Sequence, residues 1–387
     1  MAGGFALMYT INANSFPIYD QRTDVYVARN AKATISVNEP DELTFRVDYD
    51  HPNLSRLSPL SATVELKQDT DVLLRGRIIN DTIDTDLTHS IIVEGALGWL
   101  NDSIIEPFNF PDDFLSDPAY QSAAVSGNVV EYFLRWIISR HNAQTNAERR
   151  LTLGTVTVAD PNNYLARSST EYNTAWETVR TKLFESTLGG YLVVRYDSIY
   201  TYIDYLSAFP TVINQSVEFG ENLLKVSNEL DATETYSVIL PIGSDGLTIA
   251  ALPDRDLTTD LVKQGSTIYS RRLAAEFGRV VRCVKWDDVT LIGNLRDKAM
   301  TALSSQGIAQ TLTVNAVDLH ATGDNIDPFR VGNKVIFESA PHGFNNPTTY
   351  PILTLEIDLA DPSQTQITLQ RTSTSQSTLY SRLKGSK

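Results

Sequence analysis

The sequence is poor in cysteine and in positive charge. Its 387 residues include one cysteine, Cys283, which excludes an internal disulfide framework and a multi-cysteine zinc site. Lys and Arg number 32 against 47 Asp and Glu, giving a formal net charge of -15. Binding to nucleic acid or to anionic lipid requires clustered basic residues, so this balance argues against both kinds of surface.

Long apolar runs are missing as well. No window approaches the roughly 18 apolar residues of a membrane-spanning helix. The N-terminal stretch MAGGFALMYTINANSFPIYD has no basic region of a signal peptide, so we expect a protein made in a cytoplasm. Apolar residues still make up 42% of the chain, enough for real cores, and the length predicts about two to four domains.

Signatures of catalysis and of metal binding are also lacking. The chain has no G-x-S-x-G turn, no H-E-x-x-H helix and no glycine-rich phosphate loop. The five histidines are scattered singly, and Cys283 lies in an alternating stretch that predicts a small buried hydrophobe. The acidic clusters at 81–86, 111–117 and 253–256 lack the calcium-loop pattern and are interpreted as solvated turns. We therefore expect no catalytic residue, no cofactor and no metal ligand.

What is present is a series of strand-like and helix-like blocks. Residues 5–50 and 62–95 alternate apolar and polar positions around turn signals, which predicts an antiparallel meander. Apolar spacing predicts helices over 126–142, capped by Ser126, and over 168–190, capped by Gly189. Further expected elements are a tyrosine-rich hairpin at 190–206, strands at 217–240, helices at 270–277 and 289–306, strands at 312–369 and a solvated tail at 371–387. Such blocks predict an α+β fold rather than a doubly wound sheet.

The segment VEGALGWLNDSIIEP, residues 93–107, places Asn101, Asp102 and Ser103 in a row. These polar groups are of the kind that carry out chemistry, but no base or nucleophile signature accompanies them. We interpret Trp99 and Leu100 as the end of a strand, the polar residues as a turn, and the segment as a connection between two domains.

Two parts of the chain resemble each other. Residues 45–96 and 312–369 both run from a strand ending in Val-Asp, with a histidine two or three residues later, through a polar link into three strands. One interpretation is that any two three-stranded meanders look alike. The other is a duplicated module, which would bear on the symmetry of an assembly.

Four stretches, in order, resemble the prophage endopeptidase tail family, the tail-tip hub proteins of siphophages. The first is IIVEGALGWLNDSIIEP, with Trp99, Asn101 and Asp102, and the second is TAWETVRTKLFESTLGGYLVVRYDSIYTYIDYL, with Gly189 and Gly190. The third is VEFGENLLKVSNELDATETYSVILPIGSDG, with Gly220, Asn222, Asp231, Pro241 and Gly243. The fourth joins AVDLHATGDNIDPFRVGNKVIF, with Asp318 and Gly332, to LEIDLADPSQTQITL.

The resemblance implies a multi-domain fold similar to the baseplate hub of contractile phages. It places tube-like β domains at 1–100 and, discontinuously, at 216–240 and 307–371. The remaining parts are α+β domains at 101–215 and 241–306 and a disordered tail at 372–387. Family members form homotrimers in which two tube-like domains per chain build a pseudo-sixfold ring.

The function implied is a non-enzymatic structural hub at the distal end of a phage tail, which opens for DNA exit. The implied partners are further copies of the chain, the distal tail protein, the tape-measure protein and receptor-binding proteins, with DNA only in transit. Longer members append a peptidoglycan hydrolase, which we do not expect in this chain. Two alternatives stay open: a peptidoglycan-degrading tail lysin, and a cell-wall carbohydrate-binding protein that uses the tyrosine hairpin.

Overall fold

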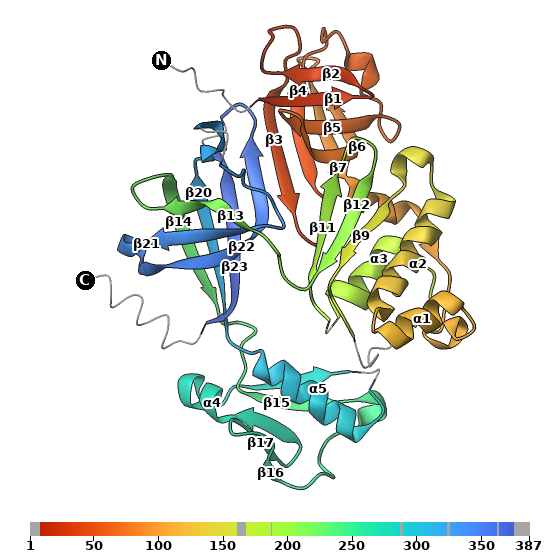
Figure 1. Ribbon diagram of the computed structural model, residues 1–387, viewed down its shortest axis with the longest axis vertical. Coiled ribbons are helices and arrows are strands. Elements are labelled where there is room, and N and C mark those ends of the chain that lie inside the picture. The colour runs from red at the N-terminus through yellow and green to blue at the C-terminus, as the bar shows by residue number, and fades with distance from the viewer. Residues whose placement is uncertain are drawn as a thin grey trace. The chain divides into compact units, whose positions relative to one another are not determined.

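The computed structural model describes residues 8–160, 168–186, 188–286, 289–322, 326–361 and 364–374. The chain divides into two compact units. The first unit consists of Met1–Lys225, Val314–Ile336 and Pro351–Thr368, and the second of Val226–Thr313, Phe337–Tyr350 and Leu369–Lys387. The predicted α+β class is confirmed, since sheets dominate and the helices are gathered in separate blocks (Figure 1).

The first seven strands form what we call the N-terminal β module. Its strands pair in the order β3-β4-β7-β6-β5-β1-β2. Period-two burial in β4, β5 and β7 shows why these segments are strands: one face of each carries the apolar residues that fill the core. The strands are β1 (Tyr9–Ala13), β2 (Phe16–Asp20), β3 (Arg29–Ser36), β4 (Glu42–Val47), β5 (Thr63–Gln68), β6 (Asp71–Ile83) and β7 (His89–Gly95). A short 3-10 helix, η1 (Leu54–Arg56), joins β4 to β5.

An α/β region follows in the same unit. Strand β9 runs parallel to β12, which pairs antiparallel with β11, and helices α2 and α3 pack side by side near β9 (Figure 1). Its helices are α1 (Pro118–Ser126), α2 (Val129–Gln144), α3 (Ala175–Val179), the 3-10 helices η2 (Ala96–Asp102), η3 (Asp112–Phe114) and η4 (Ala147–Arg149), and the π-helical turn η5 (Arg180–Phe184). Its strands are β8 (Ile104–Ile105), β9 (Thr152–Val156), β10 (Asn173–Thr174), β11 (Tyr191–Tyr196) and β12 (Thr201–Leu206).

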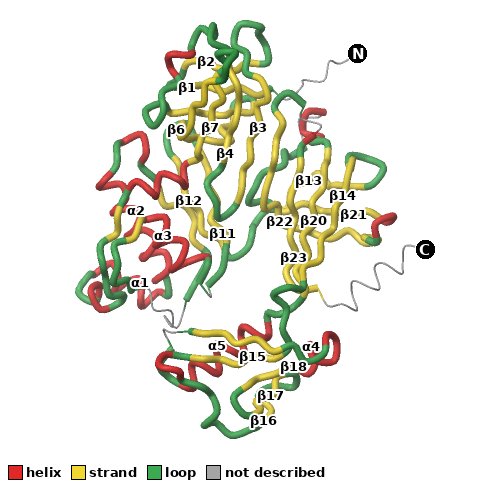
Figure 2. Tube along the Cα trace, turned by 180° about the vertical axis from the view of Figure 1, so that it is seen from behind, coloured by secondary structure: helices red, strands yellow, loops and turns green. Residues whose placement is uncertain are grey.

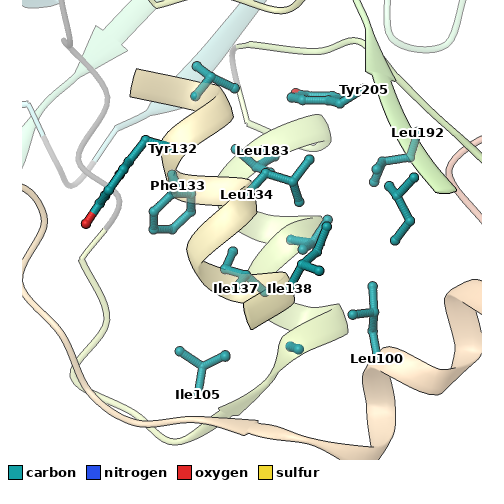
Figure 3. Packing of buried hydrophobic residues seen from close by; sticks show 14 of the residues in the cluster. Leu100, Ile105, Tyr132, Phe133, Leu134, Ile137, Ile138, Leu183, Leu192 and Tyr205 are labelled. Carbon is teal, nitrogen blue, oxygen red and sulfur yellow. The ribbon is translucent and has the colours of Figure 1, made fainter. Parts of the chain in front are cut away.

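One apolar cluster holds this region together. Leu134, Ile137 and Ile138 of α2 face Leu183 of η5 and Leu192 of β11 (Figure 3). Leu100 of η2 belongs to the same cluster, so the segment that leaves the N-terminal β module is buried in the core of the next region. Burial of this many large side chains is the main stabilising contribution to the region.

Several expected boundaries in this region are wrong. Trp99 and Leu100 do not close a strand but lie in η2. Ser126 is the last residue of α1 and not the cap of α2, because Gly127, at φ 78°, ends one helix just before the next begins. The helix expected over 168–190 begins only at Ala175, where the Thr174 side chain accepts a hydrogen bond from the backbone N–H of Glu177.

The remaining strands of the large sheet form the C-terminal β module. It comprises β13 (Val212–Glu218), β14 (Leu223–Asp231), β20 (Ile308–Ala316), β21 (Lys334–Ser339), β22 (Phe344–Asp358) and β23 (Gln366–Thr374), with the 3-10 helices η7 (Leu319–Thr322) and η8 (Ala340–His342). The tail expected at 371–387 is wrong at its start, since 371–374 belong to β23, and residues 375–387 lie outside the described residues.

Both β modules pair their strands in the same order. The C-terminal order is β14-β20-β23-β22-β21-β13, and the N-terminal order is β3-β4-β7-β6-β5-β1, so each strand of one has a counterpart in the other. In each module a 3-10 helix joins the second strand of this order to the fifth. The counterparts β5 and β21 show the same alternating burial. Two meanders alike by chance would have no reason to share all these features, so they support a duplicated module.

A smaller α/β sheet is inserted between β14 and β20. Its strand order is β16-β17-β18-β15-β19, and Leu295, Ala299 and Leu303 of α5 are fully buried in its core, as their helical spacing predicts. The elements are β15 (Val238–Ile242), η6 (Ser244–Gly246), β16 (Arg255–Asp256), β17 (Leu261–Gln264), β18 (Thr267–Ser270), α4 (Arg271–Phe277), β19 (Val281–Lys285) and α5 (Ile292–Ser304). The burial expected for Cys283 is wrong: it is exposed on β19, none of whose residues is buried.

The Gly189–Gly190 turn that leads into β11 gives a first prediction. Gly190 has φ 94°, and a Cβ there would lie 2.7 Å from Val158 Cγ2 and 2.9 Å from Tyr205 Cε2. Gly190→Ala combines backbone strain with overpacking and should lower the free energy of unfolding by about 2–4 kcal/mol in urea denaturation. The matched control is Gly127→Ala, whose φ is also positive but whose Cβ meets nothing within 4 Å; we expect a loss of about 1 kcal/mol. Equal losses would contradict the packing argument.

Candidate functional site

The residues that carry the family resemblance do not converge on one site. Two of them, Asn222 and Asp318, come from distant parts of the chain but lie close together, because the Asn222 side chain bonds Val317, the residue before Asp318. Two others, Asn101 and Asp102, lie at the end of η2. The rest occupy separate turns or strands, where each has a local structural role.

Asn222 and Asp318 stabilise the loops next to two neighbouring strands of the C-terminal β module, since Asn222 directly precedes β14 and Asp318 follows β20. The Asn222 side chain accepts a hydrogen bond from Glu218 N (3.0 Å) and donates to Ser216 O (2.9 Å) and Val317 O (3.3 Å). The carboxylate of Asp318 accepts from Gln215 Nε2 (2.8 Å), His320 N (3.0 Å) and Phe329 N (3.2 Å). These groups satisfy backbone N–H donors in loops, which is a structural role.

Gln215 was not anticipated from the sequence. Its amide donates to Asp318 and to Asp327 O (2.5 Å), and its side-chain oxygen accepts from Leu319 N (3.1 Å). A buried glutamine in an alternating strand is the signal that could have revealed it, because a buried amide needs partners. His320 also bonds a backbone oxygen, that of Ile326. The corresponding histidine of the N-terminal module, His51, likewise contacts Ile18 O (2.9 Å).

Asp102 belongs to a network of ion pairs at the end of η2. It is bonded to Arg77 of β6 and to Arg149 of η4 (3.0 Å), and Arg77 also contacts Glu94 of β7 (3.0 Å). Burial by itself would lower the pKa of the Arg77 guanidinium, but the hydrogen bonds that it donates to Asp102 and Glu94, together with the charges of these carboxylates, raise it. Arg77 is buried and joins the N-terminal β module to the segment that leaves it. No pattern in the sequence predicts this network, apart from two arginines within an apolar strand.

Trp99, two residues before Asn101, acts by packing. Its side chain is fully buried, and its Nε1 finds no hydrogen-bond acceptor within the described ranges. Asn101 Oδ1 is 3.4 Å from the Thr174 hydroxyl, near the start of α3. Asn101 and Asp102 of the segment 93–107 therefore hold neighbouring elements in place, as expected of a connection between two parts of the fold.

The remaining motif residues shape turns or fill tight places. Gly189, Gly220 and Gly332 have positive φ angles, and the Asp231 side chain accepts hydrogen bonds from Thr233. Gly243 leaves no room for a side chain, since a Cβ would lie 2.5 Å from Val289 O. Pro241 lies in β15 opposite Val284 of β19.

A cavity of about 860 Å³ opens in the first unit. It is lined by strands of both β modules and by the β11–β12 hairpin, and its polar groups are paired with one another. Asp204 accepts from Arg195 Nε (3.0 Å) and Thr155 N (2.6 Å), while Glu65 is bonded to Arg75 Nε (2.8 Å). Carboxylates committed in this way to cationic or backbone donors have structural roles.

Asp41 is the carboxyl of this cavity that differs most from its ordinary state. It is buried and accepts from Ser36 N (3.0 Å) and from the hydroxyl of Tyr196 (3.3 Å). Burial raises its pKa to about 7, although both hydrogen bonds oppose the rise. The contact joins the β3–β4 turn to the β11–β12 hairpin, so Asp41 helps to dock the α/β region on the N-terminal β module.

The tyrosine hairpin forms no continuous platform. Tyr205 is buried with its hydroxyl 2.5 Å from Gly189 O, and Tyr196 points to Asp41. Tyr200 and Tyr202 stay together near the tip, with Tyr202 bonded to Asp197 (3.0 Å) and covered by Arg195. Most of these rings serve core packing.

Over the ranges that the structure describes, no three His, Cys, Asp or Glu side chains come together in a way that could hold a metal ion. Within the same ranges, no helix is long and apolar enough to cross a membrane.

Comparison with known proteins identifies the kind of fold. Residues 212–378 match the model of the family described as prophage endopeptidase tail. A prophage tail protein of Listeria monocytogenes is 13% identical with a TM-score of 0.51, the match covering 97% of this chain and 98% of that one. The fold is that of prophage tail proteins. The resemblance inferred from the sequence is thereby confirmed.

Two further solved structures agree. The 43 kDa tail protein of prophage MuSo2 from Shewanella oneidensis is 10% identical, with a TM-score of 0.55 over 95% of this chain and 98% of that one. The tail protein from Neisseria meningitidis is 14% identical, with a TM-score of 0.55 over 95% and 97% of the two chains. No curated protein matches the sequence.

The Arg77 network predicts a large loss of stability on truncation. Arg77→Ala leaves the half-buried Glu94 without its cation and leaves Asp102 with Arg149 alone, so we expect the free energy of unfolding to fall by about 2–3 kcal/mol. Arg135→Ala is the control, since its guanidinium is 61% exposed and pairs with Glu131 one helical turn away; we expect less than about 0.5 kcal/mol. Urea denaturation measures both, and similar losses would show that the network does not stabilise the fold.

Asp41 predicts a dependence of stability on pH. In the unfolded chain this carboxyl loses its proton near pH 4, whereas the folded chain keeps it to about pH 7. Its contribution is therefore greatest below pH 4, decreases as the pH rises and is lost above pH 7, a change on the order of 4 kcal/mol.

Asp41→Asn removes this titration while keeping the side-chain shape. The difference in Tm between variant and wild type, measured by calorimetry, should grow in favour of the variant from pH 4 to pH 8. Asp231→Asn, at an exposed turn whose hydrogen bonds with Thr233 lower the pKa, should give a profile parallel to the wild type between pH 5 and pH 8. A constant Tm difference for Asp41→Asn would show that the carboxyl titrates normally.

Proposed function

We propose that the protein is a non-enzymatic structural hub of a bacteriophage or prophage tail tip. In this proposal three copies close the distal end of the tail tube and connect the sixfold distal tail ring to the tip, and the trimer opens for DNA exit. The fold shared with prophage tail proteins and the family match of residues 212–378 support a place in the phage tail.

The duplicated β module is the observation that carries this proposal. A threefold particle can meet a sixfold ring only if each chain offers two similar contacts. The two modules have the same strand order, so three chains present six similar modules around one axis. This arrangement makes further copies of the chain and the distal tail protein the main partners, with tape-measure and receptor-binding proteins as further ones.

The charge of the chain fits a tube that DNA passes through. A net charge of -15 repels the phosphate backbone, so a lumen lined by such a protein does not retain DNA during ejection. The proposal assigns no catalytic residue and places the protein in the virion.

The test is the shape and mass of the purified protein. We expect light scattering to give three times the chain mass of 42.9 kDa at micromolar concentration, and negative-stain images to show rings with a central hole. Incubation with bacterial cell walls should release no more muropeptides than buffer does. A monomer in solution without rings, or enzymatic release of muropeptides, would overturn the proposal.

A further inference from the structure

The chain already contains one junction between two β modules. Residues 354–358 of β22 pair antiparallel with residues 32–36 of β3 (Figure 2). The junction is apolar at its centre, where Leu355 lies opposite Ile35 and Ile357 lies opposite Ala33. Leu353, just before it, packs against Val193 and Phe209. All the apolar side chains of β22 in this stretch are buried.

The counterpart of β22 in the N-terminal β module is β6, and the two strands can be aligned residue by residue. Ile78 O accepts a hydrogen bond from Leu60 N (2.9 Å), and Ile352 O accepts one from Gly332 N (3.4 Å). Leu60 and Gly332 both have positive φ and both precede the next strand of their module. Ile78 therefore corresponds to Ile352, which makes Ile79 the counterpart of Leu353 and Ile83 the counterpart of Ile357.

The counterparts differ sharply in burial. Leu353 and Ile357 are 9% and 3% exposed, whereas Ile79 and Ile83 are 47% and 58% exposed. Beyond Ile78, β6 keeps β7 on one edge, and none of the described strands pairs with its other edge. The end of β6 thus has the same place as the β22 end of the junction, with the covering strand missing.

The other half of the junction is also repeated. The counterpart of β3 is β14, which lies at the end of the sheet and, among the described strands, pairs only with β20. Seven of its nine residues are exposed, including Leu224 and Leu230 at 57% and 44%. Natural proteins seldom leave a long, partly apolar edge strand uncovered, because its free N–H and C=O groups recruit another strand.

We propose that β6 of one copy, through residues 79–83, pairs with β14 of a second copy and so repeats between chains the junction that β22 and β3 make within a chain. This inference rests on the proposed trimeric hub and identifies the surfaces that join its chains. The contact is heterologous, since each copy uses two different edges, and such contacts close into a ring of three when each copy is rotated by a third of a turn from the last. One position departs from the repeat: Asp81 replaces Leu355 and is already bonded to His89 at 3.0 Å.

The experiment disables each edge separately. Ile79→Asp with Ile83→Asp changes the β6 edge, and Leu224→Asp with Leu230→Asp changes the β14 edge. Each pair of substitutions should reduce the mass measured by light scattering from three chains to one at micromolar concentration. Val125→Asp with Ile199→Asp is the matched control, because these side chains are 91% and 73% exposed on other elements; it should leave the trimer unchanged.

A mixture of the two disabled variants gives the decisive result. The β6 variant keeps an intact β14, and the β14 variant keeps an intact β6, so one junction can still form and the mixture should give a dimer of one copy of each. Disabled variants that remain trimeric would overturn the inference but leave the proposed hub standing. A wild-type protein that stays monomeric would overturn both. Circular dichroism spectra equal to the wild type confirm that the variants are folded.

Discussion

The need of sheet edges for a partner determines how this protein is built. Backbone N–H and C=O groups on the edge of a strand have to be paired or left to water. The chain meets this need once by itself, where β22 of the C-terminal module adds to β3 of the N-terminal module and one sheet runs through both. Because the modules are alike, the same need arises again at β6 and β14. The repeat that stabilises the single chain is thus also the source of its open edges.

The α/β region is attached to this sheet by polar contacts as well as by apolar ones. Arg77 binds carboxylates from β7 and η2, and Asp41 binds the hairpin through Tyr196. Contacts of this kind fix direction, because a buried charged group tolerates few arrangements of its partners. The proposed hub has to keep its modules in register and needs such fixed attachments. The polar groups that resembled a catalytic site in the sequence are explained by this structural demand.

Periodicity predicted what depends on local pattern. The β11–β12 hairpin, the presence of helix α5 and the α+β class follow from spacing and turn residues. What failed depended on tertiary context. The cap of α3 is Thr174 and not a residue near 168, because residues 173–174 first pair with β8. Cys283 lies in β19, whose sequence alternates apolar and polar residues although neither face of the strand is buried. The partners of Arg77, Asp41 and Gln215 are distant in the chain, and no single sequence shows such pairs.

The two halves of the repeat are similar but not equal, and the difference suits their tasks. Within the chain, Leu355 opposes Ile35 at the centre of the junction, and an apolar junction of this kind forms once, during folding, and persists. At the same place β6 carries Asp81, whose charge is kept solvated or paired with His89. A charged centre weakens premature pairing of free chains and disfavours pairing of the wrong edges. In the proposed trimer, the same fold makes a permanent contact inside the chain and a more selective one between chains, which is what a particle assembled in order from separate subunits requires.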